Sequence, residues 1–319
     1  RSLVHIYQDR SVGISTGAIE MGQGVNTKII QVAAQVLSIS PGRIKIESTN
    51  TTRVANTSPT AASTGADLNG HATKIACREL SSRLLDIAAA ELGCGREDIN
   101  FKNEFVYKNN EKTNLHWNEL VETAFLKRVC LTENGHYATP KIHFDKTLEK
   151  GHPFAYHVYG TAIIQVTVDC IRGTYAFDKV QIVHDFGKSM NPVLDYGQVE
   201  GALVQGIGWM TMEELAFSNQ GILLSNSLST YKVPDIFSVP REVNIKALET
   251  DGAELAILKS KAVGEPPFLY GIGAYFAIRN AIKAFNGKIK PAFNAPYTHE
   301  KTLMDLYEEP GSQKDTLAK

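Results

Sequence analysis

The residues best suited to chemistry lie in the segment Lys-Ala-Val-Gly-Glu-Pro-Pro at 261–267, where Glu265 stands between Gly264 and Pro266. Proline restricts the residue before it to extended backbone, and the two prolines supply no amide hydrogen. Glu265 also precedes an expected helix, whose N-terminal partial positive charge favours an ionised carboxylate. A rigid, ionised carboxylate is suited to general-base catalysis. The local residues by themselves favour a simpler interpretation, a glutamate that caps a helix on a surface turn.

Two glutamines beside glycines are the next candidates, Gln23 in Gly22-Gln23-Gly24 and Gln198 after Gly197. Glycine lets backbone amides approach a ligand, a following helix N-terminus attracts anions, and glutamine adds a donor and an acceptor. Each segment taken alone fits equally well as a tight strand-to-helix turn without a ligand. Neither has the spacing of a dinucleotide-binding or Walker loop, so NAD and ATP have little support.

A run of small and hydroxyl residues at 56–65 includes Ala61, Ala62 and Ser63. Such a loop can let a bulky ligand reach the backbone, although composition alone favours a flexible surface loop. It contains no GxSxG nucleophile elbow. The nine histidines lack metal-ligand spacing, and the four scattered cysteines indicate reduced thiols in a cytoplasmic compartment. The sequence therefore predicts no side-chain metal site.

Hydrophobic periodicity indicates the elements that position the first candidates. Alternation predicts a strand at 12–16, and apolar residues at helical spacing predict a helix over 29–37. Asn26 or Thr27 can cap this helix. A longer helix follows the small-residue run, with Asp67 as its expected cap. The glycine-flanked glutamine and the small-residue run thus each precede a helix.

The second half of the chain begins with long β-rich runs at 156–169 and 174–184, which are joined by a short glycine-containing loop and predict a hairpin. Helices over about 198–212 and 268–285 follow. Strands and helices mix without regular β-α-β alternation. The predicted fold class is therefore α+β, with two mixed sheet-and-helix modules, rather than a doubly wound sheet.

The composition limits domain number and partners. We divide the chain into a first module at 1–150, a second at 151–290 and a C-terminal tail at 291–319, whose charged end at 308–319 is expected to be disordered. The 33 Lys+Arg and 34 Asp+Glu give a net charge of −1, which argues against nucleic acid as the main partner. No stretch reaches the ~18 apolar residues of a membrane span, so a soluble protein without a membrane partner is expected.

Four segments together resemble one family. Glu-Met-Gly-Gln-Gly at 20–24, Asn-Thr-Ser-Pro-Thr-Ala-Ala-Ser at 56–63, Asn-Pro-Val-Leu-Asp-Tyr-Gly-Gln-Val-Glu-Gly at 191–201 and the segment at 261–267 occur in this order. They are similar to the C-terminal part of the molybdenum-cofactor-binding subunit of the xanthine dehydrogenase/aldehyde oxidase family. The resemblance covers about residues 3–285 and is strongest to bacterial xanthine dehydrogenases.

The resemblance assigns roles to individual residues. It implies that Glu265 is the active-site base of a hydroxylation whose oxygen comes from water, and that Ala61 and Ala62 contact substrate. It also implies that the molybdopterin cofactor contacts Gly22, Gln23, Gly24, Ala62, Ser63 and Gln198. No side chain is expected to ligate the metal directly, because the pterin holds the molybdenum. Gly65 and Ala66 stand where some members carry hydroxyl residues, so one or two cofactor hydrogen bonds are expected to be absent.

The implied reaction is hydroxylation of a purine, from hypoxanthine or xanthine to urate. An aldehyde or another N-heterocycle is the alternative within the family, and its determinants would lie in the preceding half of the subunit. A non-catalytic structural or assembly relative is an alternative of another class, but it would be expected to lose the glutamate or glutamine positions, which are intact. A hydrolase that uses Glu265 as its base would lack a second catalytic group.

The resemblance also implies partners that this sequence lacks. They are the N-terminal half of the molybdenum subunit and the domains or subunits that carry FAD and [2Fe-2S] clusters, in a homo-oligomeric cytoplasmic complex. Because the sequence opens at Arg1 within an expected strand, we expect a C-terminal fragment that is inactive and without cofactor by itself.

Overall fold

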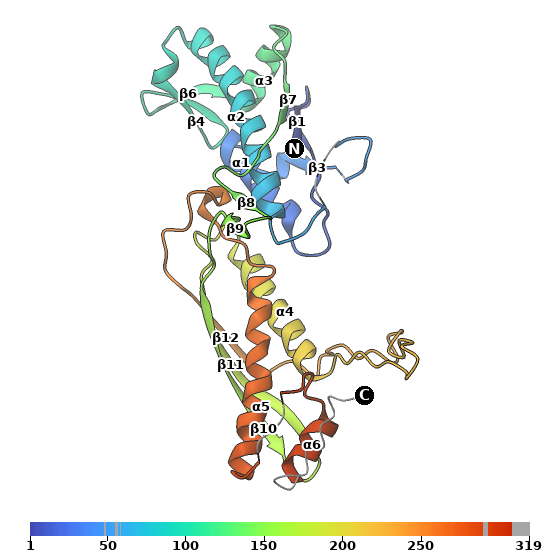
Figure 1. Ribbon diagram of the computed structural model, residues 1–319. Helices are drawn as coiled ribbons and strands as arrows, with labels where there is room; N and C mark the ends of the chain where they lie inside the picture. The colour runs from blue at the N-terminus through green and yellow to red at the C-terminus, as the bar shows by residue number, and fades with distance from the viewer. Residues whose placement is uncertain (48, 55–56, 58, 290–292, 308–319) are drawn as a thin grey trace. The chain divides into compact units, whose positions relative to one another are not determined.

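The chain folds into two compact units (Figure 1). The computed structural model describes residues 1–47, 49–54, 57, 59–289 and 293–307. Unit 1 comprises Arg1–His157, Lys188–Asn191 and Asp251–Ala262. Unit 2 comprises Val158–Gly187, Pro192–Thr250 and the described residues from Val263 onward. Two later segments, Lys188–Asn191 and Asp251–Ala262, thus belong to unit 1. A division of the chain at residue 150 would place both in the second module. The assignment of each part as a cofactor-binding module stays a prediction.

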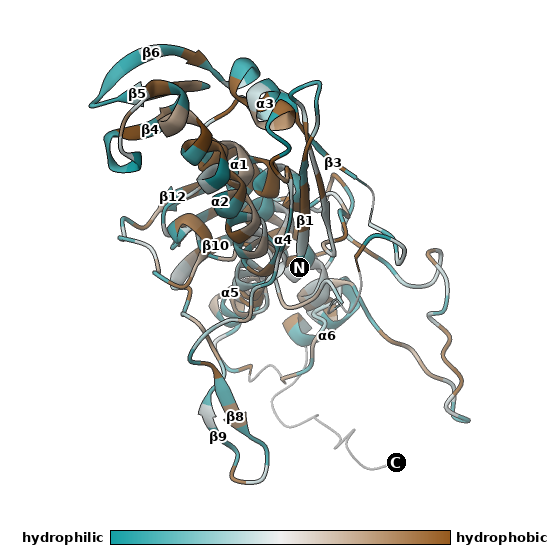
Figure 2. Ribbon diagram, turned by 90° about the horizontal axis from the view of Figure 1, so that it is seen from above, coloured by the Kyte–Doolittle hydropathy of each residue, from teal (hydrophilic) through white to brown (hydrophobic). Residues whose placement is uncertain are grey.

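Unit 1 contains a four-stranded sheet in the order β3-β2-β1-β7. Its strands are Ser2–Ile6 (β1), Val12–Thr16 (β2), Ile44–Ile46 (β3) and Thr132–Gly135 (β7). β1 pairs antiparallel with β2 and with β7, and β2 pairs parallel with β3. Val4 and Ile14 lie opposite each other and are both fully buried. Figure 2 shows β1 as largely hydrophobic, as expected for a strand whose side chains enter the core.

Three α-helices complete the core of unit 1. They are Val25–Leu37 (α1), Gly65–Leu92 (α2) and Trp117–Leu126 (α3), and α1 packs along α2. The expected caps are wrong. Gly24 is the N-cap residue of α1 at φ 77°, a conformation that glycine adopts without strain. Thr64 is the N-cap residue of α2, and Asp67 lies within its first turn with a carboxylate that bonds elsewhere.

Smaller elements surround this core. They are the strands Ile99–Lys102 (β4), Phe105–Lys108 (β5), Glu111–His116 (β6), His143–Asp145 (β8) and Lys150–His152 (β9), with 3₁₀ turns at Pro41–Arg43 (η1), Arg96–Asp98 (η2) and Ile257–Lys259 (η3). β4, β5 and β6 form an antiparallel sheet, and β8 and β9 form a hairpin. β6 is largely hydrophilic in Figure 2, consistent with a strand that lies outside the core.

Unit 2 is built on a three-stranded sheet in the order β10-β11-β12. Its elements are Gly160–Asp169 (β10), Thr174–His184 (β11), Pro192–Thr211 (α4), Glu242–Ala247 (β12), Pro266–Gly271 (η4), Ile272–Phe285 (α5) and His299–Tyr307 (α6). β10 and β11 form the predicted hairpin, and β12 joins β11 in parallel. Val180, Leu203 and Ile278, from β11, α4 and α5, are fully buried in one core. The α+β fold class is confirmed.

Three expectations for unit 2 need correction. α4 begins at Pro192 rather than near 198, because proline suits the first turn of a helix, so Gly197 lies inside the helix and not at a turn. The helix expected over 268–285 is a 3₁₀ turn followed by α5. The expected tail contains α6, which packs on β11 and α5 and buries Leu306. The segment at 308–319 lies outside the described residues.

Candidate functional site

In unit 1, Gln23 closes the loop that leads into α1. Its side-chain Nε2 donates to the carbonyl oxygen of Ile19 at 2.8 Å, and its Oε1 accepts from the amide of Met21 at 2.6 Å. Gly22, at φ 98°, and Gly24 provide the left-handed conformations that this turn requires. The predicted glutamine therefore stabilises its own loop, and contact with a ligand would require its amide to exchange one of these partners.

Glu20 occupies the amides that were expected to attract an anion. Its carboxylate accepts from the amides of Gly22 at 3.0 Å, Gly24 at 2.9 Å and Asn26 at 3.0 Å. Burial opposes ionisation of Glu20, but these hydrogen bonds together lower the pKa of its carboxyl below the usual value. Sequence reasoning gave Glu20 no role, although an acidic residue shortly before an amphipathic helix is a signal for it.

The small-residue run lies beside this loop. The Thr60 hydroxyl accepts from the amide of Ile19 at 3.0 Å, so the two predicted cofactor segments of unit 1 are joined directly. Ala62 and Ser63 both have left-handed backbone, at φ 60° and φ 50°. Non-glycine residues rarely adopt this region, and they often do so at functional sites. Ala62 is exposed and Ser63 half-buried, whereas the predicted motif members Asn56 and Ser58 lie outside the described residues.

The N-terminus of α2 follows this run and has no side-chain cap. The Thr64 hydroxyl donates to the carbonyl oxygen of Ala61 at 3.1 Å instead of accepting from the helix. A Cβ on Gly65 would lie 3.5 Å from Val25, the first residue of α1, so the two helices begin side by side. α2 thus presents backbone donors and a positive dipole end beside a loop of small residues, an arrangement that suits a ligand with anionic or acceptor groups.

In unit 2, Glu265 is exposed and directly precedes η4. The expected extended backbone is wrong, because its φ of −94° and ψ of −41° are helical. The amide of Phe268 donates to the Glu265 carbonyl oxygen at 3.0 Å and closes a turn that overrides the preference before proline. The capping interpretation also fails, since the Glu265 side chain makes no cap hydrogen bond. The carboxylate is left available at the surface of unit 2.

Gln198 lies in the second turn of α4 and is half-buried. Glycines bring α4 against η4, the element that Glu265 precedes. A Cβ on Gly206 would lie 3.1 Å from the Cα of Gly271, and closer still to the carbonyl oxygen of Phe268. Unit 2 therefore brings α4, which carries Gln198, into close backbone contact with η4, which follows Glu265.

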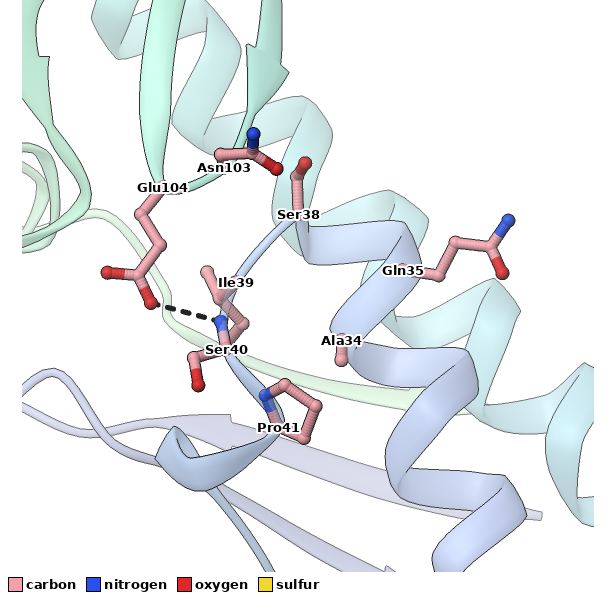
Figure 3. A pocket seen from close by; sticks show the side chains of 8 residues that line it. All are labelled: Ala34, Gln35, Ser38, Ile39, Ser40, Pro41, Asn103 and Glu104. Atoms are coloured by element: carbon pink, nitrogen blue, oxygen red, sulfur yellow. Dashed lines mark hydrogen bonds between the residues drawn. The ribbon is translucent and has the colours of Figure 1, made fainter. Parts of the chain in front are cut away.

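Figure 3 shows a pocket in unit 1 away from these residues. It has a volume of about 540 Å³ and is lined by Ala34, Gln35, Ser38, Ile39, Ser40, Pro41, Asn103 and Glu104. The Glu104 carboxylate accepts from the amide of Ser40 at 3.0 Å and forms a bidentate pair with Arg43, with both distances 2.9 Å. The Arg43 guanidinium lowers the pKa of Glu104 to about 2. Because this carboxylate is already paired, the pocket is a weaker candidate than the loops before α1 and α2.

The described residues show neither a side-chain metal site nor a membrane-spanning helix. They contain no group of three or more His, Cys, Asp or Glu side chains placed to hold a metal ion. They also contain no helix with the length and apolar character needed to cross a membrane.

The sequence comparison decides the family. Residues 1–240 match the family described as "Molybdopterin cofactor-binding domain". The chain belongs to this family. The xanthine dehydrogenase/oxidase of Felis catus is 40% identical over 307 residues, which are 94% of this chain and 22% of that protein. Xanthine dehydrogenase 2 of Arabidopsis thaliana is 35% identical over 319 residues, 97% of this chain and 22% of that protein. These matches confirm the resemblance to xanthine dehydrogenases, and particular likeness to bacterial members stays a prediction.

Two solved structures share the fold of this chain. Quinoline 2-oxidoreductase from Pseudomonas putida 86 superposes with a TM-score of 0.83 at 22% identity, over 97% of this chain and 38% of that chain. The aldehyde oxidoreductase from Desulfovibrio gigas gives a TM-score of 0.72 at 22% identity, over 96% and 30%. The chain spans about a fifth of the length of the curated relatives described above.

Proposed function

We propose that this chain is the C-terminal, molybdopterin-binding part of a molybdenum hydroxylase of the xanthine dehydrogenase type. The observation that carries the proposal is the 40% identity to a xanthine dehydrogenase/oxidase along 94% of the chain. Gln23, Gln198 and Glu265 are all present at the positions that the family motifs require.

The loops before α1 and α2 fit a cofactor of this kind. A pterin ring offers several hydrogen-bonding atoms, and its phosphate is anionic. The uncapped start of α2 supplies backbone donors and a positive dipole end, while Ala62 and Ser63 leave room for a bulky group at the backbone. We assign the holding of the cofactor to these residues and to Gly22, Gln23 and Gly24. Because Glu20 already accepts from the amides of Gly22 and Gly24, Gln23 would exchange one of its loop hydrogen bonds for a bond to the cofactor. When bound, molybdopterin supplies a metal centre that activates a water-derived oxygen and accepts the electrons of the oxidation.

Glu265 acts as general base in this proposal. Its carboxylate is exposed and free of a cap hydrogen bond, so it can accept a proton, while the turn closed by Phe268 holds its backbone. Gln198 provides a neutral donor and acceptor on α4 that orients a bound group without competing for the proton. We assign substrate contact to Ala61 and Ala62, whose small exposed side chains would let a flat substrate approach the backbone.

The proposed substrate is a purine such as hypoxanthine or xanthine, with an aldehyde or another N-heterocycle as the alternative. The proposed partners are the remainder of the molybdenum subunit and the modules with FAD and [2Fe-2S] clusters that remove electrons, in a homo-oligomeric cytoplasmic complex. Comparing kcat/KM for hypoxanthine, xanthine and aldehydes in the complete enzyme separates these substrates, since the preferred one has the highest value.

The test of the base is Glu265→Gln in the complete enzyme that contains this chain. We expect molybdenum and pterin contents to stay at the wild-type level while kcat falls on the order of 10²–10⁴-fold. Glu249→Gln is the matched control, because Glu249 is also an exposed glutamate of unit 2 but lies in the loop after β12. Wild-type kcat in Glu265→Gln would remove the residue from the mechanism. A wild-type complex that contains no molybdenum would instead favour the alternative function, a non-catalytic structural or assembly protein.

A further inference from the structure

A partly buried chain of hydrogen bonds holds the segment that leads to Glu265. The Tyr156 hydroxyl donates to Oδ2 of Asp67 at 2.5 Å and accepts from the amide of Ala262 at 3.1 Å. The other oxygen of Asp67 accepts from the amide of Ile257 at 2.8 Å. Burial and the Asp67 charge raise the pKa of Tyr156, so the hydroxyl stays protonated and able to donate. Tyr156 and Asp67 thus hold the amides of Ala262 and Ile257, which lie in the part of unit 1 at Asp251–Ala262.

Ala262 is the last residue of unit 1 and lies three residues before Glu265. The intervening Val263 is 5% exposed and belongs to the core of unit 2. Three residues span at most about 11 Å when extended, so only a short stretch of chain separates the held Ala262 amide from Glu265. Only Gly264 separates the buried valine from the glutamate, which leaves little chain to absorb a displacement.

A second hydrogen bond holds η4, the 3₁₀ turn that follows Glu265. The hydroxyl of Tyr270, in η4, lies 2.7 Å from Nδ1 of His184 at the end of β11. His184 is fully buried, and no described residue pairs with its Nε2. Burial lowers the pKa of His184 to about 4, so the ring is neutral at pH 7. Removing the Tyr270 hydroxyl would leave this buried ring without a hydrogen bond among the described residues.

Glu265 itself does not fix its own position. Its side chain is exposed and makes no cap hydrogen bond, so its placement depends on the backbone on either side. We infer that Tyr156 and Tyr270 are positioning residues for Glu265, because their hydroxyls hold the chain before it and the 3₁₀ turn after it. This inference rests on the proposed role of Glu265 as base. Neither hydroxyl is assigned a contact with substrate or cofactor.

Three matched tyrosine substitutions in the complete enzyme test the inference. Tyr156→Phe and Tyr270→Phe each remove one positioning hydroxyl. Tyr175→Phe is the control, because Tyr175 is also half-buried and its hydroxyl donates to the backbone oxygen of Tyr297 at 2.8 Å, within unit 2. We expect kcat to fall about 10–100-fold in the first two variants with KM changed less than about twofold, since a misplaced base affects the chemical step. The control is expected to keep wild-type kcat.

Amide hydrogen exchange supplies a readout that does not depend on turnover. Tyr156→Phe is expected to accelerate exchange at Ala262, and Tyr270→Phe at Phe268, each on the order of tenfold. Tyr175→Phe should leave both amides at their wild-type rates. Unchanged exchange at these amides would overturn the inference, as would faster exchange with unaltered kcat.

Adding each substitution to Glu265→Gln separates this inference from the proposed function. If the tyrosines act through Glu265, they should lower kcat of the Glu265→Gln enzyme by less than about twofold. A full additional loss in that background would overturn the positioning role and leave Glu265 as base intact. Wild-type kcat in Glu265→Gln alone would overturn the proposed base, whereas the exchange rates would still report whether the hydroxyls hold the segment.

Discussion

Two alanine substitutions on α4 should change stability in opposite directions. Gly201 and Gly206 both lie inside this helix, and replacement of glycine by alanine in a helix interior normally stabilises a protein by about 1 kcal/mol. A Cβ on Gly201 would meet no atom within 4 Å. A Cβ on Gly206 would lie 3.1 Å from Cα and 3.2 Å from the amide nitrogen of Gly271, and closer still to the Phe268 carbonyl oxygen.

These distances determine the expected magnitudes. The three atoms nearest to this Cβ belong to the backbone of η4, so the contact is not relieved by rotation of a side chain and the turn must shift. Overpacking of this kind costs about 1–3 kcal/mol, and the rigid contact favours the upper value. After the gain of about 1 kcal/mol in helix propensity, Gly206→Ala should lower the free energy of unfolding by about 2 kcal/mol. Gly201→Ala should raise it by about 1 kcal/mol.

Urea unfolding followed by tryptophan fluorescence measures both effects. Trp209 is a suitable probe because it stacks on Phe268 of η4, with ring centroids 5.2 Å apart. It therefore reports on the same contact that Gly206→Ala would disturb. The reasoning would be refuted if Gly206→Ala were as stable as Gly201→Ala, since the close approach of α4 and η4 would then be absent.

Three further predictions concern single groups of unit 1. Glu20→Gln should lower the free energy of unfolding, measured by urea titration, by about 1 kcal/mol at pH 7. The difference from wild type should vanish as pH falls well below 4.5, because the Glu20 carboxylate, whose pKa is lowered in the folded state, stabilises the fold only while it is ionised. Glu104→Gln should cost about 1–2 kcal/mol at pH 7 through loss of the Arg43 pair, and this difference should shrink as pH falls below about 4.5 and be gone near pH 2; equal stability at pH 7 would contradict it. In thiol labelling of the native protein, exposed Cys130 should react readily, whereas buried Cys77, whose pKa burial raises to about 12, should react only on unfolding.

Periodicity predicted the bodies of the main elements, because the burial of one face leaves a regular apolar pattern in the sequence. The hairpin of β10 and β11 and most of α1 follow this rule, whereas the predicted strand at 12–16 is buried on both faces. Helix starts were predicted less well. Gly24 begins α1 by adopting a left-handed conformation, and Pro192 begins α4 ahead of the residues that show the clearest pattern. Both depend on backbone dihedral angles, which hydropathy does not report.

For the candidate site, too, the sequence predicted the residues but not their contacts or backbone conformation. The motifs pointed to Gln23 and Glu265 because the residue types and their order along the chain resemble a family. They could not show that Gln23 bonds its own loop or that Glu265 has helical backbone. They also did not reveal Glu20, whose role depends on three amides that converge on one carboxylate.

The sequence by itself determined the family, the α+β class and the positions where cofactor and base residues are expected, since these follow from local patterns and from motifs that occur together. Only the tertiary structure decided which distant groups meet. Asp67 bonds an amide 190 positions later in the sequence, and the Thr60 hydroxyl joins the loop before α1. Such contacts form where packing of the helices and sheets brings polar groups from distant parts of the chain together, and no local pattern encodes that pairing.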